Sequence, residues 1–384
     1  MNEVLSGGDL SRLRQLNGLA VIGVLRDGPA LTLTELAKRT GLSRASTEDV
    51  VRELRERGWV VEAEPAVGTV GRPARRYRFE ADAGRILGVD IGGHKILAQI
   101  ADLSGTVLQS TRIVVSPTLG RAERLAAVDE AVAAVLRKEN VEGSRIWATG
   151  VATTGLVDGT GRVMLSDALP EWTGVDVATH IRRLVAGPVL VENDCKVAAL
   201  AETWTGVARY AKDVVFLFAG LRAGTGLIID GKLHRGFGNA AGEIGALPAA
   251  RWLHGQEHLR SWSKSAEDDV QDVFSAARSG DKKAATAVRR YVKDLAVGAS
   301  ALILTLDPEL VVVGGGFSRA SDLIVEPLRR EIDRWCLRTP EIRVSSFGDE
   351  GVALGAIRLA LNHIETTLQG GVELASTDKF HQRP

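Results

Sequence analysis

The stretch ILGVDIGGHK, residues 86–95, decides the fold class, because an apolar strand runs here directly into a polar, glycine-rich turn. Glycines at a strand end let backbone N–H groups approach a phosphate, and the carboxylate of Asp90 could hold a hydrated Mg²⁺ ion. The alternative is a β-hairpin whose turn needs glycine only for a positive φ. The stretch alone leaves both interpretations open.

The chain on both sides of this stretch alternates between strands and helices. Polar turns that contain glycine or aspartate follow the strands repeatedly, and this alternation predicts an α/β fold. We expect three strands over residues 86–115, a helix over 121–139, a strand over 145–157, a strand and a helix over 188–204, a hairpin over 214–236, a long helical stretch over about 266–304, and a strand and a helix over 309–332.

Three more turns in this region could carry chemistry. The segment Glu192-Asn193-Asp194 follows an apolar strand, where a carboxylate can accept a proton from a sugar hydroxyl, as the bases of kinases do. The alternative is a helix cap, since asparagine and aspartate are favoured there. Residues 220–226 and 314–316 are rich in glycine and are candidate nucleotide loops.

The pattern of residues 1–83 is typical of a winged helix-turn-helix domain. Apolar residues recur at helical spacing until an Asp-Gly-Pro turn at 27–29 ends the first helix. A short helix follows, and a third helix begins near Ser43. Two short strands, residues 59–61 and 77–79, then enclose a turn rich in glycine, proline and arginine.

The composition limits the class of protein. The 384 residues suit two or three domains, and 48 basic residues balance 48 acidic ones, which excludes a broadly basic surface for nucleic acid. Charge is uneven locally, because residues 65–79 hold four arginines and no acid. No apolar run reaches the roughly 18 residues of a membrane helix. Two cysteines, Cys195 and Cys336, are too few for a disulfide framework.

In this order and spacing, the motifs of residues 10–365 resemble those of the ROK family (repressors, open reading frames and sugar kinases). DIGGHK is similar to the family's first phosphate motif, DxGGTK, and END to the strand end that carries the catalytic aspartate. GKLHRGFGNAAGEIG resembles the signature around the sugar-binding glutamate, and VVVGGGFSRA and GVALGAIRLAL resemble segments of the nucleotide lobe. NGLAVIGVL, GLSRAS and GRPARRYRF are similar to the helix-turn-helix and wing of the family's repressors.

The resemblance implies an actin-like (ribonuclease H-like) sugar kinase fold of two lobes over residues 84–384, preceded by the winged helix-turn-helix domain of residues 1–83. It implies that Asn193, Asp194 and Glu243 bind sugar, with Asp194 as a vestigial catalytic base. The vestigial phosphate-binding residues that it implies are Asp90, Gly92, Gly93, Lys95, Gly224 and Gly315.

The phosphate loops depart from the family pattern. His94 replaces the threonine of the first loop, and Leu221 and Arg222 occupy the places of small residues in the second. Arg222 could bind an anion or fill the nucleotide cleft. Because phosphoryl transfer depends on positioning and charge stabilisation, altered loops favour a sensor descended from a kinase over an enzyme.

The zinc segment of the family is absent as well. Ala246 replaces the histidine of the family's ExGH motif, and the segment of residues 250–258 that stands in place of the zinc motif contains no cysteine. His254 and His258 could share a helix face, but tetrahedral zinc requires four ligands. We therefore expect no metal and no cofactor, with ATP and Mg²⁺ needed only if the domain is a kinase.

The candidate DNA-binding residues lie at the start of the third helix and in the wing. Recognition helices place their N-terminal residues against base edges, and an arginine there can bind guanine, whereas wing arginines suit the backbone or a narrow minor groove. The alternative for the wing is a solvated hairpin. The candidates are Ser43, Arg44, Ser46, Thr47, Arg72, Arg75 and Arg76.

Together these features predict a cytoplasmic transcriptional regulator, a repressor of genes for carbohydrate uptake or metabolism. Its expected partners are double-stranded operator DNA, a sugar, amino sugar, oligosaccharide or sugar phosphate, and a second copy of the chain in a homodimer or a tetramer, with no membrane. The first alternative is an ATP-dependent sugar kinase of the hexokinase type with a fused DNA-binding module. The second is a regulator that responds only to protein partners.

Overall fold

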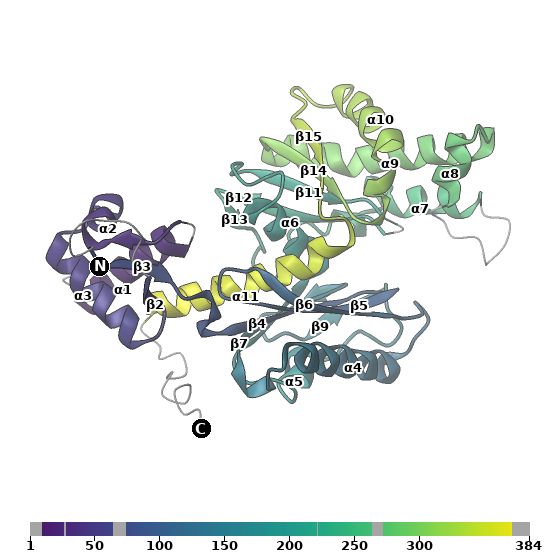
Figure 1. Ribbon diagram of the computed structural model, residues 1–384. Helices are drawn as coiled ribbons and strands as arrows, with labels where there is room; N and C mark the ends of the chain where they lie inside the picture. Colours follow the sequence, from purple (N-terminus) through teal and green to yellow (C-terminus); the bar gives the residue numbers. More distant parts are fainter. Residues whose placement is uncertain (1–9, 27, 64–73, 221, 263–271, 371–384) are drawn as a thin grey trace, which may run out of the picture.

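A computed structural model describes residues 10–26, 28–63, 74–220, 222–262 and 272–370. A small N-terminal module lies beside two lobes, and the last helix, α11 (Gly351–Gly370), runs from between the lobes to the module (Figure 1). Within the described residues, no helix has the combination of length and apolarity that crossing a membrane requires.

The N-terminal module has three helices and a three-stranded antiparallel sheet of order β1-β3-β2. Its local signals act as expected: Thr32 and Glu35 form a capping box at α2, and Gly41 ends that helix at φ 74°. Ser43 caps α3 by accepting the backbone N–H of Ser46. The elements are α1 (Leu10–Arg26), β1 (Leu31–Thr32), α2 (Leu33–Thr40), α3 (Arg44–Glu56), β2 (Val60–Ala63) and β3 (Arg76–Phe79).

Lobe 1 is a five-stranded sheet of order β10-β7-β4-β5-β6, in which β10, β7 and β4 are parallel and the other two pairings are antiparallel. Helices α4 and α5 cover one face of it (Figure 1). The elements are β4 (Arg85–Ile91), β5 (Lys95–Ala101), β6 (Val107–Val114), α4 (Arg121–Glu139), β7 (Ile146–Thr153), β8 (Leu156–Val157), β9 (Val163–Leu165), α5 (Val177–Ile181) and β10 (Val189–Asn193).

Lobe 2 repeats this pattern with the order β13-β12-β11-β14-β15, again three parallel strands and two antiparallel pairings. Helix α6 (Asp194–Trp204) connects the lobes. The other elements are β11 (Val214–Phe218), β12 (Gly224–Ile229), β13 (Lys232–Leu233), α7 (Trp252–Arg260), α8 (Asp272–Arg278), α9 (Lys282–Leu306), β14 (Leu310–Gly314), α10 (Ser321–Asp333) and β15 (Glu341–Val344). Two such lobes confirm the predicted α/β, actin-like fold.

The helical stretch expected over about 266–304 consists, in its described part, of two helices, α8 and α9. The chain breaks between α8 and α9 at Gly280, whose φ of 92° a helix cannot accommodate. Asp281 then caps α9 by accepting the backbone N–H groups of Lys283 and Ala284. Residues 263–271 of the predicted stretch lie outside the described residues.

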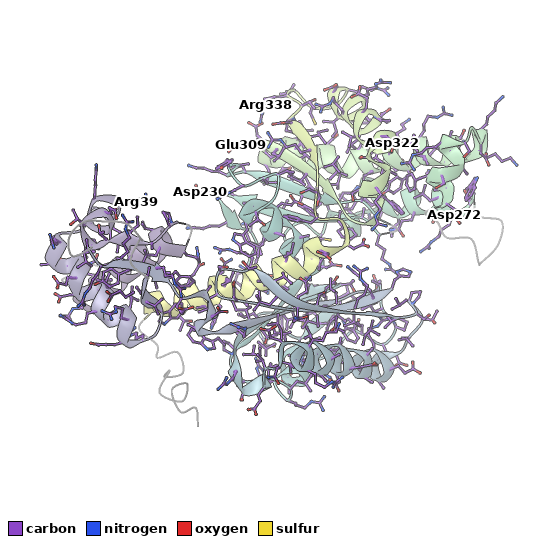
Figure 2. All side chains as sticks on the ribbon, viewed as in Figure 1. Arg39, Asp230, Asp272, Glu309, Asp322 and Arg338 are labelled. Atoms are coloured by element: carbon purple, nitrogen blue, oxygen red, sulfur yellow. The ribbon has the colours of Figure 1, made fainter. Side chains whose placement is uncertain are left out.

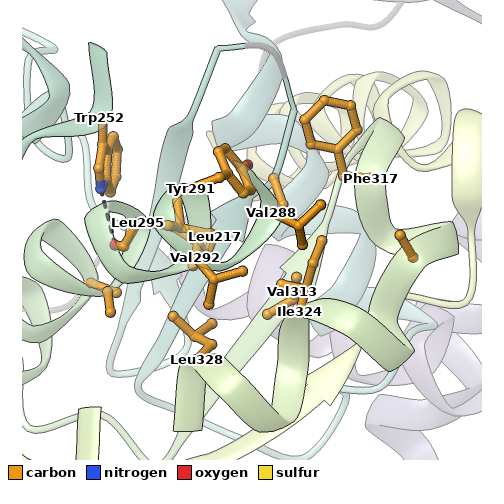
Figure 3. Packing of buried hydrophobic residues seen from close by; sticks show 14 of the residues in the cluster. Leu217, Trp252, Val288, Tyr291, Val292, Leu295, Val313, Phe317, Ile324 and Leu328 are labelled. Carbon is orange, nitrogen blue, oxygen red and sulfur yellow. Dashed lines mark hydrogen bonds between the residues drawn. The ribbon is translucent and has the colours of Figure 1, made fainter. Parts of the chain in front are cut away.

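Each lobe has its own hydrophobic core. In lobe 2, Trp252 and Tyr291 pack beside valines and leucines of α9 and the sheet, and the indole N–H of Trp252 donates to the carbonyl of Leu295 at 3.1 Å (Figure 3). The core of the module continues into lobe 1 and α11, where the rings of Trp59 and Trp147 meet edge to face at 5.1 Å between centroids. The module and lobe 1 therefore share one core.

Charges of both signs cover the outer surface. Arg39 lies on the outer side of the module, and lobe 2 carries ion pairs such as Arg278–Asp322 and Arg338–Asp307, each 2.6 Å long (Figure 2). In these pairs, opposite charges on the surface of lobe 2 offset each other.

Candidate functional site

The carboxylates predicted to bind sugar, Asp194 and Glu243, lie together with Asp90, which was predicted to bind phosphate. Asp90 is the penultimate residue of β4, and Asn193 is the last residue of β10. Both strands flank β7 in parallel register, with Asp90 opposite Ala152 and Asn193 opposite Thr153. Asp194 follows as the first residue of α6. The charges of Asp90 and Glu243 both act on Asp194, so the structure brings these three carboxylates together.

Asn193 performs the helix-capping role that the sequence left open. Its side-chain oxygen accepts the backbone N–H groups of Cys195 and Lys196 at 3.0 and 3.2 Å, and its amide nitrogen donates to the carbonyl of Gly155 at 3.0 Å. Only 6% of Asn193 is exposed, and its oxygen is engaged within the protein. Contact with a sugar by Asn193 stays a prediction. The carboxylate of Asp194 accepts the backbone N–H of Cys195 at 2.8 Å, a donor that it shares with Asn193.

The pKa values of all three carboxylates are raised. Burial, reinforced by the negative charge of Asp90, raises the pKa of Asp194 to about 7, against hydrogen bonds from Cys195 that lower it. Burial also raises the pKa of Asp90, although the ammonium of Lys95 lies 3.1 Å from its carboxylate. Burial raises the pKa of Glu243 too, opposed by the charge of Lys196. Glu243 itself is exposed to solvent.

Two cations at this site were not foreseen. Lys196 is buried, and its ammonium donates to the carbonyl of Asn239 in the loop that leads to Glu243. Arg235 pairs with the buried Glu192 at 2.6 Å. The sequence did carry a signal for Lys196, because a lysine stands alone among apolar residues in DCKVAALA. A buried lysine requires acidic or carbonyl partners, which this site provides.

The first glycine turn is a β-hairpin between β4 and β5. The N–H of Gly92 donates to the carbonyl of Lys95 at 3.0 Å, and neither Gly92 nor Gly93 has a positive φ. Lys95 pairs with Asp90 and also donates to the backbone carbonyl of Asp349. The fully buried Arg124, which sequence reasoning missed, donates to the carbonyl of Gly92 at 2.6 Å. The structure thus directs the loop's lysine to protein partners, and its phosphate-binding role stays a prediction.

Close packing and backbone conformation explain why glycine occupies the other two predicted phosphate-binding positions. A Cβ on Gly224 would lie 2.5 Å from Cys195 Sγ, and Gly315 has a φ of 87°. Arg222 is exposed, and the pKa of its guanidinium is lowered by partial burial and by Arg260, against the charge of Asp167. Leu221 lies outside the described residues.

The segment that replaces the family's zinc motif is held by other contacts. His258 Nε2 lies 3.1 Å from Asp294 Oδ2, and Arg251 Nε donates to Asp294 Oδ1 at 2.7 Å. In the ranges that the structure covers, no group of three or more metal-binding side chains occurs, and His254 has no such partner set. These donors do not fit a structural zinc ion.

The start of α3 presents part of the predicted DNA surface. Arg44 is exposed at the first helical position, and the hydroxyl groups of Ser43 and Ser46 lie 2.9 Å apart. Thr47 contradicts its prediction as a groove-facing residue, because it is fully buried and its hydroxyl donates to the carbonyl of Ser43. The buried face of α3 packs on α1 and α2, and position 47 falls on that face.

The wing arginines are partly engaged within the module. Arg75 lies 3.5 Å from Glu62, and Arg76 donates to the carbonyl of Ala30 at 2.8 Å and lies 3.5 Å from Glu35. Arg72 lies outside the described residues. Arg75, with a side chain 59% exposed, therefore remains available to DNA, whereas Arg76 holds β3 to the chain before α2.

Comparison with known proteins gives a consistent result. A model of the ROK family matches residues 86–258 and 255–363, and a model of the IclR helix-turn-helix domain matches residues 16–64. The chain is 24% identical to a xylose repressor of Caldicellulosiruptor bescii, over 92% of this chain and 98% of that one.

Two solved structures share the fold over different extents. A ROK family transcriptional regulator, described as a homologue of the E. coli MLC protein, aligns with 94% of this chain and 98% of its own at a TM-score of 0.73 and 20% identity. A ROK family glucokinase from Streptomyces griseus, solved with glucose and AMPPNP, covers 73% of this chain and 100% of its own at a TM-score of 0.61 and 26% identity. The kinase alignment thus spans a smaller share of this chain than the regulator alignment.

Proposed function

The chain belongs to the ROK family, and from this premise we propose that it is a sugar-responsive transcriptional repressor. The observation that carries the proposal is the joining of a capped helix-turn-helix module to a two-lobed sugar-kinase fold through one continuous core. A module packed in this way is positioned to respond to the sensor. The similarity to a xylose repressor over nearly the whole chain supports the same function.

The proposed effector is a monosaccharide or a close derivative of one. Carboxylates are strong acceptors for sugar hydroxyl groups, and Asp90, Asp194 and Glu243 lie together at the site. The glucokinase that shares the fold was solved with glucose, and the similar repressor is named for xylose. A thermal-shift screen with D-xylose, D-glucose and N-acetyl-D-glucosamine tests this class. Glu243→Gln should abolish the shift, and a shift that survives in this variant would place the sugar elsewhere.

The proposed assembly is a homodimer in the cytoplasm, bound to a palindromic operator with one module on each half-site. Arg44 is the residue expected to contact a base edge, and Arg75 the residue expected to contact the backbone. No cofactor is required for this function.

The experiment that tests the repressor proposal is a fluorescence-anisotropy titration of the protein's own promoter DNA against random DNA at several salt concentrations. Specific binding should be at least about 10³-fold tighter than non-specific binding at physiological salt. Arg44→Ala should reduce the specific binding, while the exposed Arg121 of lobe 1 supplies a matched control as Arg121→Ala. Equal affinity for both DNAs would reject the proposal.

A second candidate function, an ATP-dependent sugar kinase, is favoured by one observation. A carboxylate with a pKa of about 7, such as that of Asp194, suits a general base that removes a proton from a sugar hydroxyl. The engagement of Lys95 by Asp90 and Asp349 counts against it. A coupled assay for ADP release with the same sugars decides the matter: turnover near 1 s⁻¹ that Asp194→Asn abolishes would establish the kinase.

A further inference from the structure

Helix α6 runs from the carboxylates of the proposed sugar site to Trp204, which contacts α11 and the β5–β6 turn. It begins at Asp194 and ends at Trp204, and its 11 residues correspond to about 16 Å along the axis. A helix transmits displacement along its axis because its backbone hydrogen bonds hold its length. The contacts at the two ends of α6 therefore decide which parts of the protein this helix can couple.

The first turns of α6 are clamped by backbone contacts. A Cβ on Gly226 of β12 would lie 2.5 Å from the carbonyl oxygen of Cys195, and one on Gly355 of α11 would lie 1.8 Å from that of Val197. Only glycine permits such approaches, so α6 is wedged between lobe 2 and α11. A shift of lobe 2 relative to lobe 1 must displace α6, α11 or both.

Trp204, the last residue of α6, contacts two segments that lead to the module. The first of these segments is α11. The guanidinium of Arg358 lies over the ring of Trp204, 5.6 Å from its centroid. Arg358 donates two hydrogen bonds, at 3.1 and 3.2 Å, to the carboxylate of Glu365. Arg26, the last residue of α1 in the module, pairs with the same carboxylate. All three charged side chains are at most 25% exposed, so solvent screens these contacts only in part.

The second connection runs through the linker between the module and lobe 1. A Cβ on Gly105 would lie 2.1 Å from Trp204 Cη2, so the indole ring rests on the turn between β5 and β6. In that turn the N–H of Leu103 donates to the carbonyl of Ala81 at 3.0 Å, and Ala81 opens the short 3-10 helix that joins the module to β4. Trp204 thus touches both the α11 route and the linker route to the module.

We propose that Trp204 is the positioning residue through which a displacement of α6 at the sugar site changes the orientation of the DNA-binding module. The inference rests on the proposed repressor function for its biological meaning. Its physical content, a coupling between the Asp194 end of α6 and the module, does not depend on DNA or on the identity of the sugar.

The first test uses the variant Trp204→Leu in the full chain, which removes the ring and the contact with Arg358 but keeps an apolar side chain. Operator affinity is measured by anisotropy with and without whichever of D-xylose, D-glucose and N-acetyl-D-glucosamine shifts the melting temperature. The ratio of the two affinities should fall about five-fold relative to the native chain, while the sugar-induced melting shift is retained. Trp335→Leu, at an exposed tryptophan of lobe 2, is the matched control and should keep the ratio. An unchanged ratio in Trp204→Leu would overturn the proposal.

The second test needs neither DNA nor sugar. Hydrogen exchange of residues 10–26 and 76–84 is compared for Asp194→Asn in the native and Trp204→Leu backgrounds. We expect Asp194→Asn to change exchange in these segments only when Trp204 is present. The same change in both backgrounds, or none in either, refutes the coupling even if operator binding succeeds. If the native chain binds no operator, the repressor proposal fails and this exchange comparison still decides the coupling.

The milder variant Glu365→Gln covers the case in which Trp204→Leu does not fold. It keeps the shape of the carboxylate but weakens its pairing with Arg26 and Arg358. We expect the sugar response and the exchange coupling to weaken in the same direction as in Trp204→Leu, but by less. Full native coupling in Glu365→Gln would show that the α11 route carries nothing.

Discussion

Replacing Asp194 with asparagine should stabilise the protein, and the gain should grow with pH. Asp194 is half-buried beside the charge of Asp90, and its pKa is about 7 in the folded chain against an ordinary value of 3.8. The folded state therefore keeps its proton at pH values where the unfolded state has lost it. This proton contributes to the stability of the native chain at low pH, and the contribution is lost as the pH rises through about 7.

The size of the effect follows from the shift. At 1.36 kcal/mol per pKa unit, a rise from 3.8 to about 7 corresponds to about 4 kcal/mol as an upper limit. Roughly two units of this range lie above pH 5, so the advantage of the variant should increase by up to about 3 kcal/mol between pH 5 and pH 8.5. Part of the shift comes from Asp90 and Glu243, which can take up protons themselves, and about 2 kcal/mol is the central expectation. Asparagine can still accept the bond from Cys195 N–H, so the local geometry is preserved.

The assay is thermal and urea unfolding of the native chain and Asp194→Asn at pH 5, 6, 7, 8 and 8.5. At about 2 °C per kcal/mol, the melting-temperature difference should widen by about 4 °C over this range. The exposed carboxylate of Glu130 on α4 supplies the control Glu130→Gln, whose curve should run parallel to that of the native chain. A constant difference between Asp194→Asn and the native chain across the pH range would refute the reasoning.

Three further predictions concern the junction, the lobe packing and the DNA surface. Trp147→Ala should reduce unfolding free energy by about 3 kcal/mol in urea titrations, because it leaves a cavity beside Trp59, and a loss below 1 kcal/mol would contradict the shared core. Gly355→Ala should destabilise the chain by more than about 3 kcal/mol, since its Cβ would lie 1.8 Å from the carbonyl of Val197, and a native melting temperature would exclude that contact. Arg44→Ala should weaken operator binding by about 1–3 kcal/mol and leave random-DNA binding nearly unchanged, as anisotropy can measure; an equal loss on both DNAs would assign Arg44 to the backbone.

The sequence predicted the elements well where the signals are local. Ser43 caps α3 and Asn193 caps α6, both at the ends of clear apolar patterns. Side-chain hydrogen bonds within three residues determine such helix ends, so they can be read without knowledge of the fold. The break between α8 and α9 was not predicted, although Gly280, with a φ of 92°, and Asp281, which caps α9, mark it locally.

The partners of the candidate residues could not be predicted in the same way. Thr47 stands beside exposed residues in the sequence, yet the packing of α3 on α1 and α2 buries it. Lys95 has the right position in its motif for a phosphate, but Asp349, more than 250 residues further along the chain, accepts one of its hydrogen bonds. Contacts between residues so far apart depend on how the lobes and α11 are placed, and no local pattern encodes them.

The sequence by itself determined the alternation of strands and helices and the helix-turn-helix pattern, because periodicity, caps and glycine turns are local properties of the chain. The order of its motifs implied the family and its two lobes by resemblance. The tertiary structure decided the charge state and the connections. It buries Asp194 beside Asp90 and so raises the pKa of Asp194 to about 7, and it places Trp204 against Gly105 and Arg358 at the module's junction. Burial and contact between distant segments arise only when the chain is folded, and they govern both the acidity of the site and its link to the DNA-binding module.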